Sequence, residues 1–325
     1  MSRKSLCLVT GGAGFIGSHM VEALLKRGLR VRVLDNLSTG KLKNLDGFKG
    51  DLDFLKGDLR REPDIHRAVR GVDYVFHIGA NRAVLRSVDN PLETNDVNVT
   101  GTLRLLVAAR NAGAKRFVFS SSSSVYGNTR KFPSHENDKP MPESPYAASK
   151  IMGEYYCRQF TQLYGLSTVS LRYFNVFGPR QNPESVYSAV IPIFIECLLK
   201  NKRPEIHWDG KQSRDFSYVD NVVYGNLCAM RAPARVSGGV FNIACHEEYS
   251  VLDIFNALKK ILKAGRELQP VFGPKRAGDV RRTFADIGRA KRELKFRVQT
   301  RFPEGLPKTV QWFLAEYYPS RRIPS

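Results

Sequence analysis

The chain has few cysteines, few histidines and a shortage of acidic residues. Only five of its 325 residues are Cys and six are His, and the cysteines show no C-x-x-C spacing: Cys7, Cys157, Cys197, Cys228 and Cys245. We therefore expect reduced thiols and no metal site. No run of about 20 apolar residues occurs, and residues 1–5 show no apolar signal region. These absences predict a cytoplasmic protein with no membrane span.

The shortage of acid leaves a strong positive charge. Asp and Glu number 31 against 51 Lys and Arg, so the net charge is +20. One interpretation is that the charge steers a doubly negative small molecule into a cleft. A second is a nucleic-acid-binding or regulatory protein, because basic stripes also bind phosphate backbones.

Glycine is placed where a phosphate-binding turn needs it. Leu6–Val9 predicts a short buried strand, and Thr10–Gly17 follows with G-x-x-G-x-x-G spacing at Gly11, Gly14 and Gly17 before an amphipathic helix. Such a turn lets a pyrophosphate approach the free N–H groups at the helix start.

A carboxylate follows at the spacing expected for a nucleotide ribose. The second predicted strand, residues 31–34, ends in Asp35, which lies 18 residues after Gly17. A carboxylate there can accept hydrogen bonds from ribose hydroxyls and repels a 2′-phosphate. This favours NAD over NADP. The alternative is a glycine turn followed by an ordinary surface aspartate.

Strand and helix patterns then alternate along the chain. Strands are predicted at 53–59, 72–78, 116–120 and 168–173, and helices at 92–112 and 145–164. This order predicts an α/β protein with a Rossmann-type, doubly wound parallel sheet and a smaller mixed α/β substrate-binding domain. We place the NAD-binding domain at residues 1–178, with 214–245 returning to it, and the second domain at 179–325.

Tyr146 and Lys150 are one helical turn apart in SPYAASK, so both side chains project from the same face. With a pKa of about 10, only about one phenol in a thousand is ionised at neutral pH, a deficit of roughly 4 kcal/mol. A nearby cation favours the phenolate, which suits a general base for an alcohol. The alternative is a plain amphipathic helix face.

Five consecutive serines, Ser120–Ser124, follow the fifth predicted strand. Ligands of doubly wound sheets bind beyond the carboxyl ends of the strands. We therefore expect these hydroxyls at the edge of the cofactor, and the alternative is a flexible polar loop.

Taken together, TGGAGFIG, SSSSVYG, Tyr146-x-x-x-Lys150, RYFNVFGPRQ, SRDFSYVDN and RAGD resemble the extended short-chain dehydrogenase/reductase family. The chain is most similar to its nucleotide-sugar 4-epimerases, from about residue 5 to about residue 295.

The resemblance implies site residues position by position. It implies cofactor contacts from Gly11, Gly14, Phe15, Ile16, Gly17, Asp35, Asn36, Asp58, Leu59, Tyr146 and Lys150. Catalysis would use Ser122, Tyr146 and Lys150. Substrate contacts would come from Ser122, Ser123, Ser124, Tyr146, Asn175, Val190, Arg214, Arg276 and Asp279. Arg82 stands where relatives carry a neutral residue or lysine near the cofactor phosphates, and Arg180, Arg281 and Arg282 are expected at the surface.

The implied reaction is NAD-dependent 4-epimerisation of a UDP-hexose through a 4-keto sugar. Ser123 and Ser124 replace the Asp-Glu pair with which related dehydratases remove a hydroxyl, so dehydration is disfavoured. Thr283 stands where a bulky aromatic residue excludes a 2-acetamido group, so UDP-N-acetylglucosamine and its galacto epimer are expected alongside UDP-glucose and UDP-galactose.

Two alternatives stay open beside this expectation. One is UDP-glucuronate 4-epimerisation or decarboxylation, which would call for an added arginine near the sugar carboxylate. The other is the nucleic-acid-binding or regulatory relative, which retention of Tyr146 and Lys150 disfavours. The resemblance also implies a homodimer formed by the helices near 92–112 and 145–164.

Overall fold

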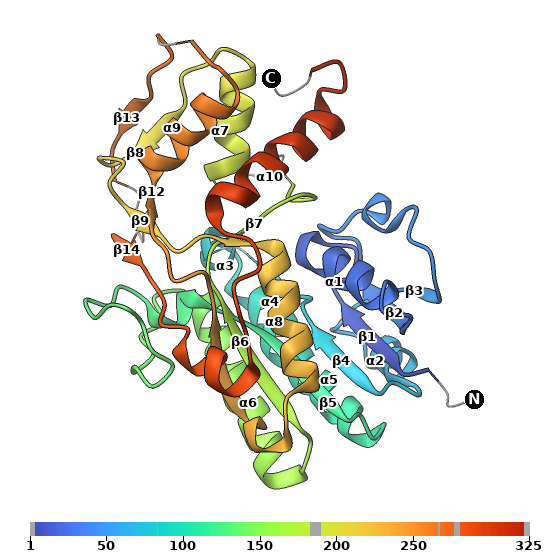
Figure 1. Cartoon of the computed structure of the whole chain (residues 1–325). Coiled ribbons are helices and arrows are strands. Elements are labelled where there is room, and N and C mark those ends of the chain that lie inside the picture. The colour runs from blue at the N-terminus through green and yellow to red at the C-terminus, as the bar shows by residue number, and fades with distance from the viewer. Residues whose placement is uncertain (1–3, 83, 183–189, 266, 276–279, 322–325) are drawn as a thin grey trace.

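A parallel sheet forms the centre of the computed structural model, which describes residues 4–82, 84–182, 190–265, 267–275 and 280–321 (Figure 1). Among these residues, seven strands pair in the order β11-β6-β5-β4-β1-β2-β3, and all neighbours are parallel. The strands are β1 (Leu6–Thr10), β2 (Arg30–Asp35), β3 (Leu52–Lys56), β4 (Tyr74–His77), β5 (Arg116–Ser122), β6 (Thr168–Tyr173) and β11 (Gly239–Ile243). The strand order reverses beside β1, so the predicted doubly wound fold is confirmed.

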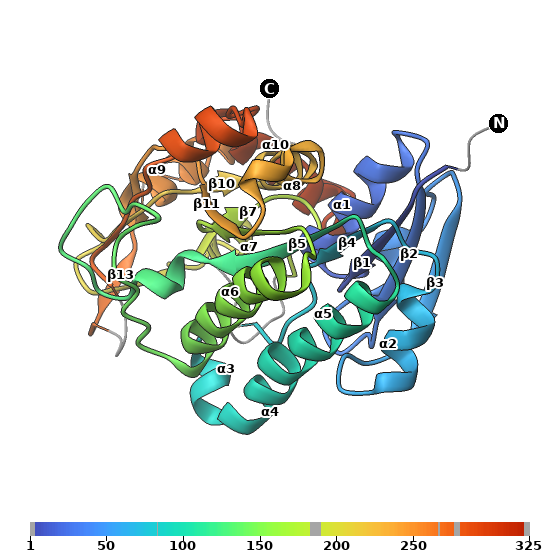
Figure 2. The same cartoon turned by 90° about the horizontal axis from the view of Figure 1, so that it is seen from below.

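Helices cover both faces of this sheet, as Figure 2 shows. On one face lie α2 (Glu62–Val69), α5 (Gly101–Asn111) and α6 (Pro145–Tyr164), and on the other lie α1 (Phe15–Leu25) and α8 (Val219–Arg231). Because both faces are covered, the central strands are buried, and all residues of β1 and β6 are buried although β6 also contains polar side chains.

Local signals account for α6, whose bounds match the predicted helix at 145–164. Ser144 caps its start by accepting a hydrogen bond from the Ala147 N–H at 3.1 Å, and Pro145 occupies the first turn. Gly165 ends the helix in the left-handed conformation, with φ of 70°.

The helix expected at 92–112 is less regular than its pattern indicates. After α3 (Val84–Asp89), α4 (Pro91–Asn95) runs into α5 through a π-helical turn at Asp96–Thr100. Within this turn Asn98 is buried and hydrogen-bonds across to Asn81, a contact that helical periodicity does not reveal. Turns of this kind often lie at functional sites.

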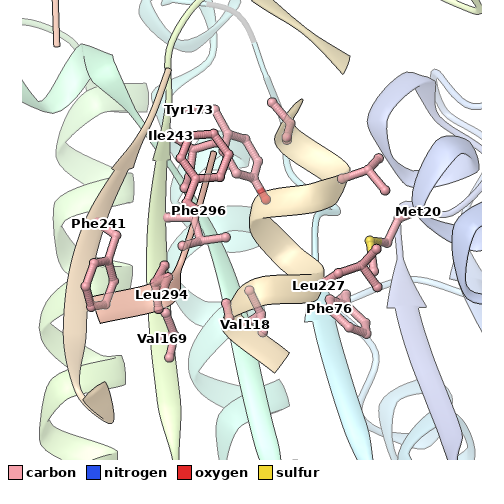
Figure 3. Close-up of a cluster of buried hydrophobic side chains, with 14 of the residues drawn as sticks. Met20, Phe76, Val118, Val169, Tyr173, Leu227, Phe241, Ile243, Leu294 and Phe296 are labelled. Atoms are coloured by element: carbon pink, nitrogen blue, oxygen red, sulfur yellow. The ribbon is translucent and has the colours of Figure 1, made fainter. Parts of the chain in front are cut away.

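One large apolar core lies between the sheet and α1 and α8. Figure 3 shows Phe76, Val118 and Val169 on the strands facing Met20 and Leu227 on these two helices. Phe241, Ile243, Leu294 and Phe296 extend the same cluster beyond β6. The core thus joins segments from both halves of the sequence.

A second core lies beyond the carboxyl ends of the strands, in the upper part of Figure 1. Here α7 (Val190–Leu199), α9 (Val251–Ile261) and α10 (Phe302–Tyr317) pack around buried aromatic rings, among them Phe177, Phe194, Phe255 and Phe302. Short strands pair around it: β7 (Val176–Phe177) with β10 (Ser217–Tyr218), β8 (Glu205–His207) with β13 (Val271–Gly273), and β9 (Ser213–Arg214) with both β12 (Tyr249–Ser250) and β14 (Arg282–Thr283). We call the part of the molecule built on the parallel sheet the first lobe and the part built on this second core the second lobe. The chain passes between the two lobes several times. The predicted division of the chain into two domains at residue 178 stays a prediction.

No helix in the ranges given above is long and apolar enough to cross a membrane. The same ranges hold no group of three or more His, Cys, Asp or Glu residues arranged to hold a metal ion.

Candidate active site

A cavity opens at the carboxyl ends of the central strands, where the strand order reverses. Its lining comes from the glycine loop, from the ends of β2, β4 and β5, and from the first turns of α6. It includes Gly11, Gly14, Phe15, Ile16, Gly17, Asp35, Asn36, Asp58, Leu59, Tyr146 and Lys150, so the fold brings every predicted cofactor residue to one cavity.

Two glycines of the loop, Gly11 and Gly17, leave no space for a side chain. Gly11 has φ of +67°, and a Cβ there would lie 2.7 Å from the Cα of Gly79 on the loop after β4. A Cβ on Gly17 would lie 2.0 Å from the Gly11 carbonyl oxygen, so the helix start packs directly on the turn. Gly14 begins α1 without a side-chain cap and faces the cavity. The first amides of α1 are therefore available to an anion.

Asp35 anchors the wall of the cavity next to this loop. The residue is 7% exposed, and its carboxylate accepts hydrogen bonds from the Ala13 and Leu37 N–H groups at 2.9 and 2.8 Å. Burial raises the pKa of Asp35, while the two amides lower it. The carboxylate thus connects the glycine loop to the end of β2 and retains lone pairs for ribose hydroxyls.

Asn36 and Asp58 lie together on the same side of the cavity. The Asn36 Nδ2 donates to Asp58 at 2.9 Å, and Arg60 holds the same carboxylate through Nε and Nη2 at 2.9 and 2.7 Å. These bonds to Arg60 depress the pKa of Asp58. Arg60 also lines the cavity, and no motif of the sequence indicates this role.

Tyr146 and Lys150 project from the first turns of α6 toward the end of β5. Lys150 is 4% exposed, and its Nζ donates to the Ser120 carbonyl at 2.8 Å and lies 5.7 Å from the centre of the Tyr146 ring. Burial lowers the pKa of Lys150 to about 8, and Glu154 opposes that shift.

The electrostatics of Tyr146 differ from the simple tyrosine–lysine pairing. Burial raises the pKa of the phenol, whereas a hydrogen bond with Ser122 and the positive charge of Arg82 lower it. In this arrangement Arg82, on the loop after β4, is the cation that acts on the phenol. The position of Arg82 beside the phenol depends on the conformation of this loop, so the spacing of residues along the sequence does not predict it.

The serine run is not a flexible loop. Ser120–Ser122 complete β5, and Ser123–Tyr126 form a 3₁₀ turn. Ser120 bonds to the Tyr173 hydroxyl at 2.9 Å, and Ser121 donates to Glu154 at 2.5 Å. Ser122 Oγ accepts from the backbone N–H and the hydroxyl of Ser124 at 3.2 and 2.9 Å. The Ser122 hydroxyl also lies close enough to the Tyr146 phenol to lower its pKa by hydrogen bonding.

A buried polar network fixes the loops around the cofactor cavity. His77 at the end of β4 hydrogen-bonds with Thr10 and Thr102, each at 2.8 Å, and burial lowers its pKa to about 3, so the ring is neutral. Asn98 in the π turn bonds to Asn81 and to the hydroxyl of Ser149, whose own proton goes to the Tyr146 carbonyl. The network therefore connects β1, β4 and α6.

The predicted substrate residues divide between two places. Ser122, Ser123, Ser124 and Tyr146 lie at the end of β5, in the turn after it and on α6, whereas Asn175, Val190 and Arg214 lie in or beside the second lobe. Asn175 has φ of 31° and donates to the Thr283 hydroxyl at 2.9 Å and to the Asp215 carbonyl at 3.1 Å. Arg214 is the register partner of Thr283 across β9 and β14, so Asn175, Arg214 and Thr283 form one group. Val190 begins α7. Arg276 and Asp279 lie outside the described residues.

Two parts of the cavity wall were not predicted from the sequence. The side chain of Arg180 is 14% exposed, pairs with Glu22 at 2.6 Å and lines the cavity, so its expected surface position is wrong. Trp312, Glu316 and Tyr317 of α10 close another side, and Glu316 pairs with Lys43. Because α10 lies far along the chain from the glycine loop, no local sequence pattern predicts that it lines the cavity.

The cavity suits a dinucleotide. The glycine turn leaves room for a pyrophosphate at the start of α1, Asp35 stands at the ribose position, and Lys150 with Tyr146 lies at the opposite end. These residues would hold NAD between the two ends of the cavity.

Comparison with known proteins agrees with this geometry. Residues 7–244 match the model of the NAD dependent epimerase/dehydratase family. The UDP-glucose 4-epimerase of Mycolicibacterium smegmatis is 39% identical over 312 residues, covering 94% of this chain and 97% of that protein.

Solved structures are similar over almost the whole chain. A UDP-N-acetylglucosamine 4-epimerase from Methanobrevibacter ruminantium, in complex with UDP-N-acetylmuramic acid, has a TM-score of 0.91 and 38% identity and covers 97% of this chain and 99% of its own. The UDP-glucose 4-epimerase of Thermus thermophilus, complexed with NAD, has a TM-score of 0.86 and 36% identity, with 95% and 98% covered. Together with the parallel sheet and the cavity, these similarities show that the chain belongs to the NAD-dependent epimerase/dehydratase family, and its cofactor is NAD.

Proposed function

We propose that this enzyme inverts the 4-hydroxyl of a UDP-hexose through a 4-keto sugar. The observation that carries the proposal is the placement of Tyr146 and Lys150 in the lining of the dinucleotide cavity, with Ser122 directly after Ser121, which also lines it. Ser123 and Ser124 stand in place of the acid pair of the dehydratases. The site thus offers a base and a hydrogen-bond donor without the acid that dehydration needs.

The roles of the side chains follow from their placement. The Tyr146 phenolate takes the proton of the 4-hydroxyl, and the Ser122 hydroxyl binds the same sugar oxygen. NAD held by the glycine loop, Asp35 and Lys150 would supply the reversible oxidation and reduction of C4. The positive charge of Arg82 lowers the pKa of the phenol and so opposes the effect of burial, while the Lys150 ammonium lies 5.7 Å from the centre of the Tyr146 ring.

Inversion requires that the sugar turn over while the nucleotide stays bound. Arg214 would hold the diphosphate through its planar guanidinium, together with Arg276. Binding free energy concentrated on the nucleotide leaves the sugar free to present either face to the cofactor.

The substrate range we propose includes the 2-acetamido sugars. Thr283 is a small residue, and its hydroxyl accepts the Asn175 amide proton beside Arg214. A small side chain here leaves room for the acetamido group of UDP-N-acetylglucosamine or UDP-N-acetylgalactosamine.

The protein is also proposed to be a cytoplasmic homodimer. Large apolar side chains are exposed on α3, α4 and α6, which pack beside one another: Val84, Leu85, Val88, Leu92, Met152, Tyr155, Leu163 and Tyr164. Patches of this kind mark protein–protein interfaces.

The function is tested by incubating purified protein with UDP-glucose, UDP-galactose and both acetamido sugars, followed by separation of products. We expect interconversion of 4-epimers, and a loss of about 10²–10⁴-fold in turnover for Tyr146→Phe with the bound NAD retained. Undiminished turnover by Tyr146→Phe would remove the base from the mechanism. Salt-dependent RNA or DNA binding by protein that converts no sugar would favour the regulatory interpretation.

A UDP-uronate is the second candidate substrate, and Arg82 is the observation that favours it. This arginine lines the cavity within electrostatic reach of Tyr146, where it can meet a C6 carboxylate. The same assay with UDP-glucuronate tests the idea, because Arg82→Gln should then impair the uronate more than UDP-glucose. Release of CO₂ would indicate decarboxylation.

A further inference from the structure

We propose that Glu154 is a positioning residue for the reaction: it holds the strand end that carries Ser122 against the helix that carries Tyr146 and Lys150. The proposal rests on the proposed function, because it concerns the alignment of these same groups. It assigns a role to a carboxylate that does not reach the cavity and that the sequence motifs leave without one.

Tyr146, Lys150 and Glu154 follow one another at single-turn intervals on α6, so they share one face of the helix. Glu154 is 4% exposed, and its carboxylate binds two different strands. Arg172 of β6 donates to it through Nε and Nη2 at 2.9 and 2.7 Å, and Ser121 of β5 donates at 2.5 Å. One carboxylate therefore joins α6, β5 and β6.

The strand end held in this way contains the catalytic serine. Ser121 lies between Ser120, whose carbonyl accepts the Lys150 proton, and Ser122, which hydrogen-bonds with Tyr146. A shift of β5 relative to α6 would alter both contacts at once. Small displacements of this kind are costly because the reacting groups must stay aligned.

Glu154 also acts on Lys150 electrostatically. The groups facing Lys150 are Tyr146, Glu154 and Cys157 on α6, His77 on β4, and the Ser120 carbonyl on β5. Burial lowers the pKa of Lys150 to about 8, and the negative charge of Glu154 acts against that shift by favouring the charged lysine. His77 is neutral, so it adds no charge to the environment of Lys150.

A buried ion pair of this type is a poor device for stability alone. Desolvation of two charges offsets much of their attraction, and apolar replacements of such pairs are often neutral. Arg172 is further held over the Tyr126 ring at 4.7 Å, so the pair has a defined geometry. Its place directly beneath the catalytic groups points to alignment.

The experiment compares Glu154→Gln with wild-type enzyme by kcat, KM and pH profile on the UDP-sugar that is turned over. We expect kcat to fall at least tenfold with KM changed less than threefold. The falling limb of the profile should move to lower pH, because Lys150 loses its proton earlier without the carboxylate. Glu154→Asp should restore the limb but not the full kcat, since it keeps the charge and shortens the reach.

Arg116→Gln is the matched control. Arg116 lies at the opposite end of β5, is 6% exposed, and donates to the Ala229 and Ala232 carbonyls at 2.7 and 2.8 Å. Its loss should lower stability without moving the pH limb. A Glu154→Gln enzyme with wild-type kcat and pH profile, or one altered only as Arg116→Gln is, would overturn the proposal.

Two further measurements cover the remaining outcomes. If Glu154→Gln does not fold, Ser121→Ala removes the bond from β5 alone, and an unchanged kcat there would refute the positioning role. If the wild-type protein converts no UDP-sugar, the proposed function fails by itself. The pH midpoint for labelling of Lys150 by an amine reagent, read by mass spectrometry, then still tests the effect of Glu154.

Discussion

At the scale of single residues, identical side chains have different roles because each meets different neighbours. Ser120, Ser121 and Ser122 contact Tyr173, Glu154 and Ser124 respectively. The sequence placed the run at a strand end, and resemblance selected Ser122. The sequence did not show that Ser121 is the serine that binds the Glu154–Arg172 ion pair, because these two residues lie on elements that follow later in the chain.

Thr283 provides the substrate-range prediction at this scale. We expect Thr283→Tyr to reduce turnover of the acetamido sugars at least tenfold relative to UDP-glucose, because its ring would fill the space for the acetamido group. The measurement is the ratio of kcat/KM for the two sugars. Thr283→Ser is the control, because it keeps the hydroxyl that binds Asn175. An unchanged ratio in Thr283→Tyr would contradict the assignment.

At the scale of elements, α6 was predictable from end to end. Ser144 and Gly165 give explicit start and stop signals, and the periodic pattern between them is uninterrupted. The helix predicted at 92–112 is not regular throughout, because a π-helical turn at Asp96–Thr100 interrupts it. Its π turn depends on Asn98 reaching Asn81, a residue 17 positions away, and no local pattern reports that contact.

The cap of α6 can be tested by Gly165→Ala. A Cβ at this position would have no atom within 4 Å, so the substitution adds only the cost of a positive φ. We expect the free energy of unfolding to fall by about 1 kcal/mol, with unchanged kcat, in a urea titration. Gly165→Asn should lose less, because Asn tolerates this conformation. Equal stability of wild type and Gly165→Ala would contradict the cap assignment.

At the scale of the whole molecule, the cavity is assembled from distant parts of the chain. The glycine loop, the end of β5 and α10 all contribute to its lining, and Arg180 connects the second lobe to α1 by pairing with Glu22. The +20 charge agrees with attraction of a UDP-sugar to this cavity.

The dimer proposal is testable at the same scale. We expect Leu92→Glu, in which a charge replaces a side chain that is 79% exposed on α4, to shift the protein from dimer to monomer. Sedimentation velocity or light scattering measures this change. Phe272→Glu is the matched control, since that ring is also exposed but lies on β13 in the other lobe. A wild-type monomer, or a Leu92→Glu dimer, would remove the proposed interface.

Residue order and spacing alone predict the alternation of strands and helices, the glycine turn before α1, Asp35 at the end of β2, and the tyrosine–lysine pair on α6. These signals are local, because they depend on residue spacing along one or two adjoining elements. Three features are visible only in the folded chain: Arg82 acts on the Tyr146 phenol, Glu154 joins α6 to β5 and β6, and α10 closes the cavity. Such contacts join residues far apart in the chain, and their geometry exists only after the sheet and both cores have packed.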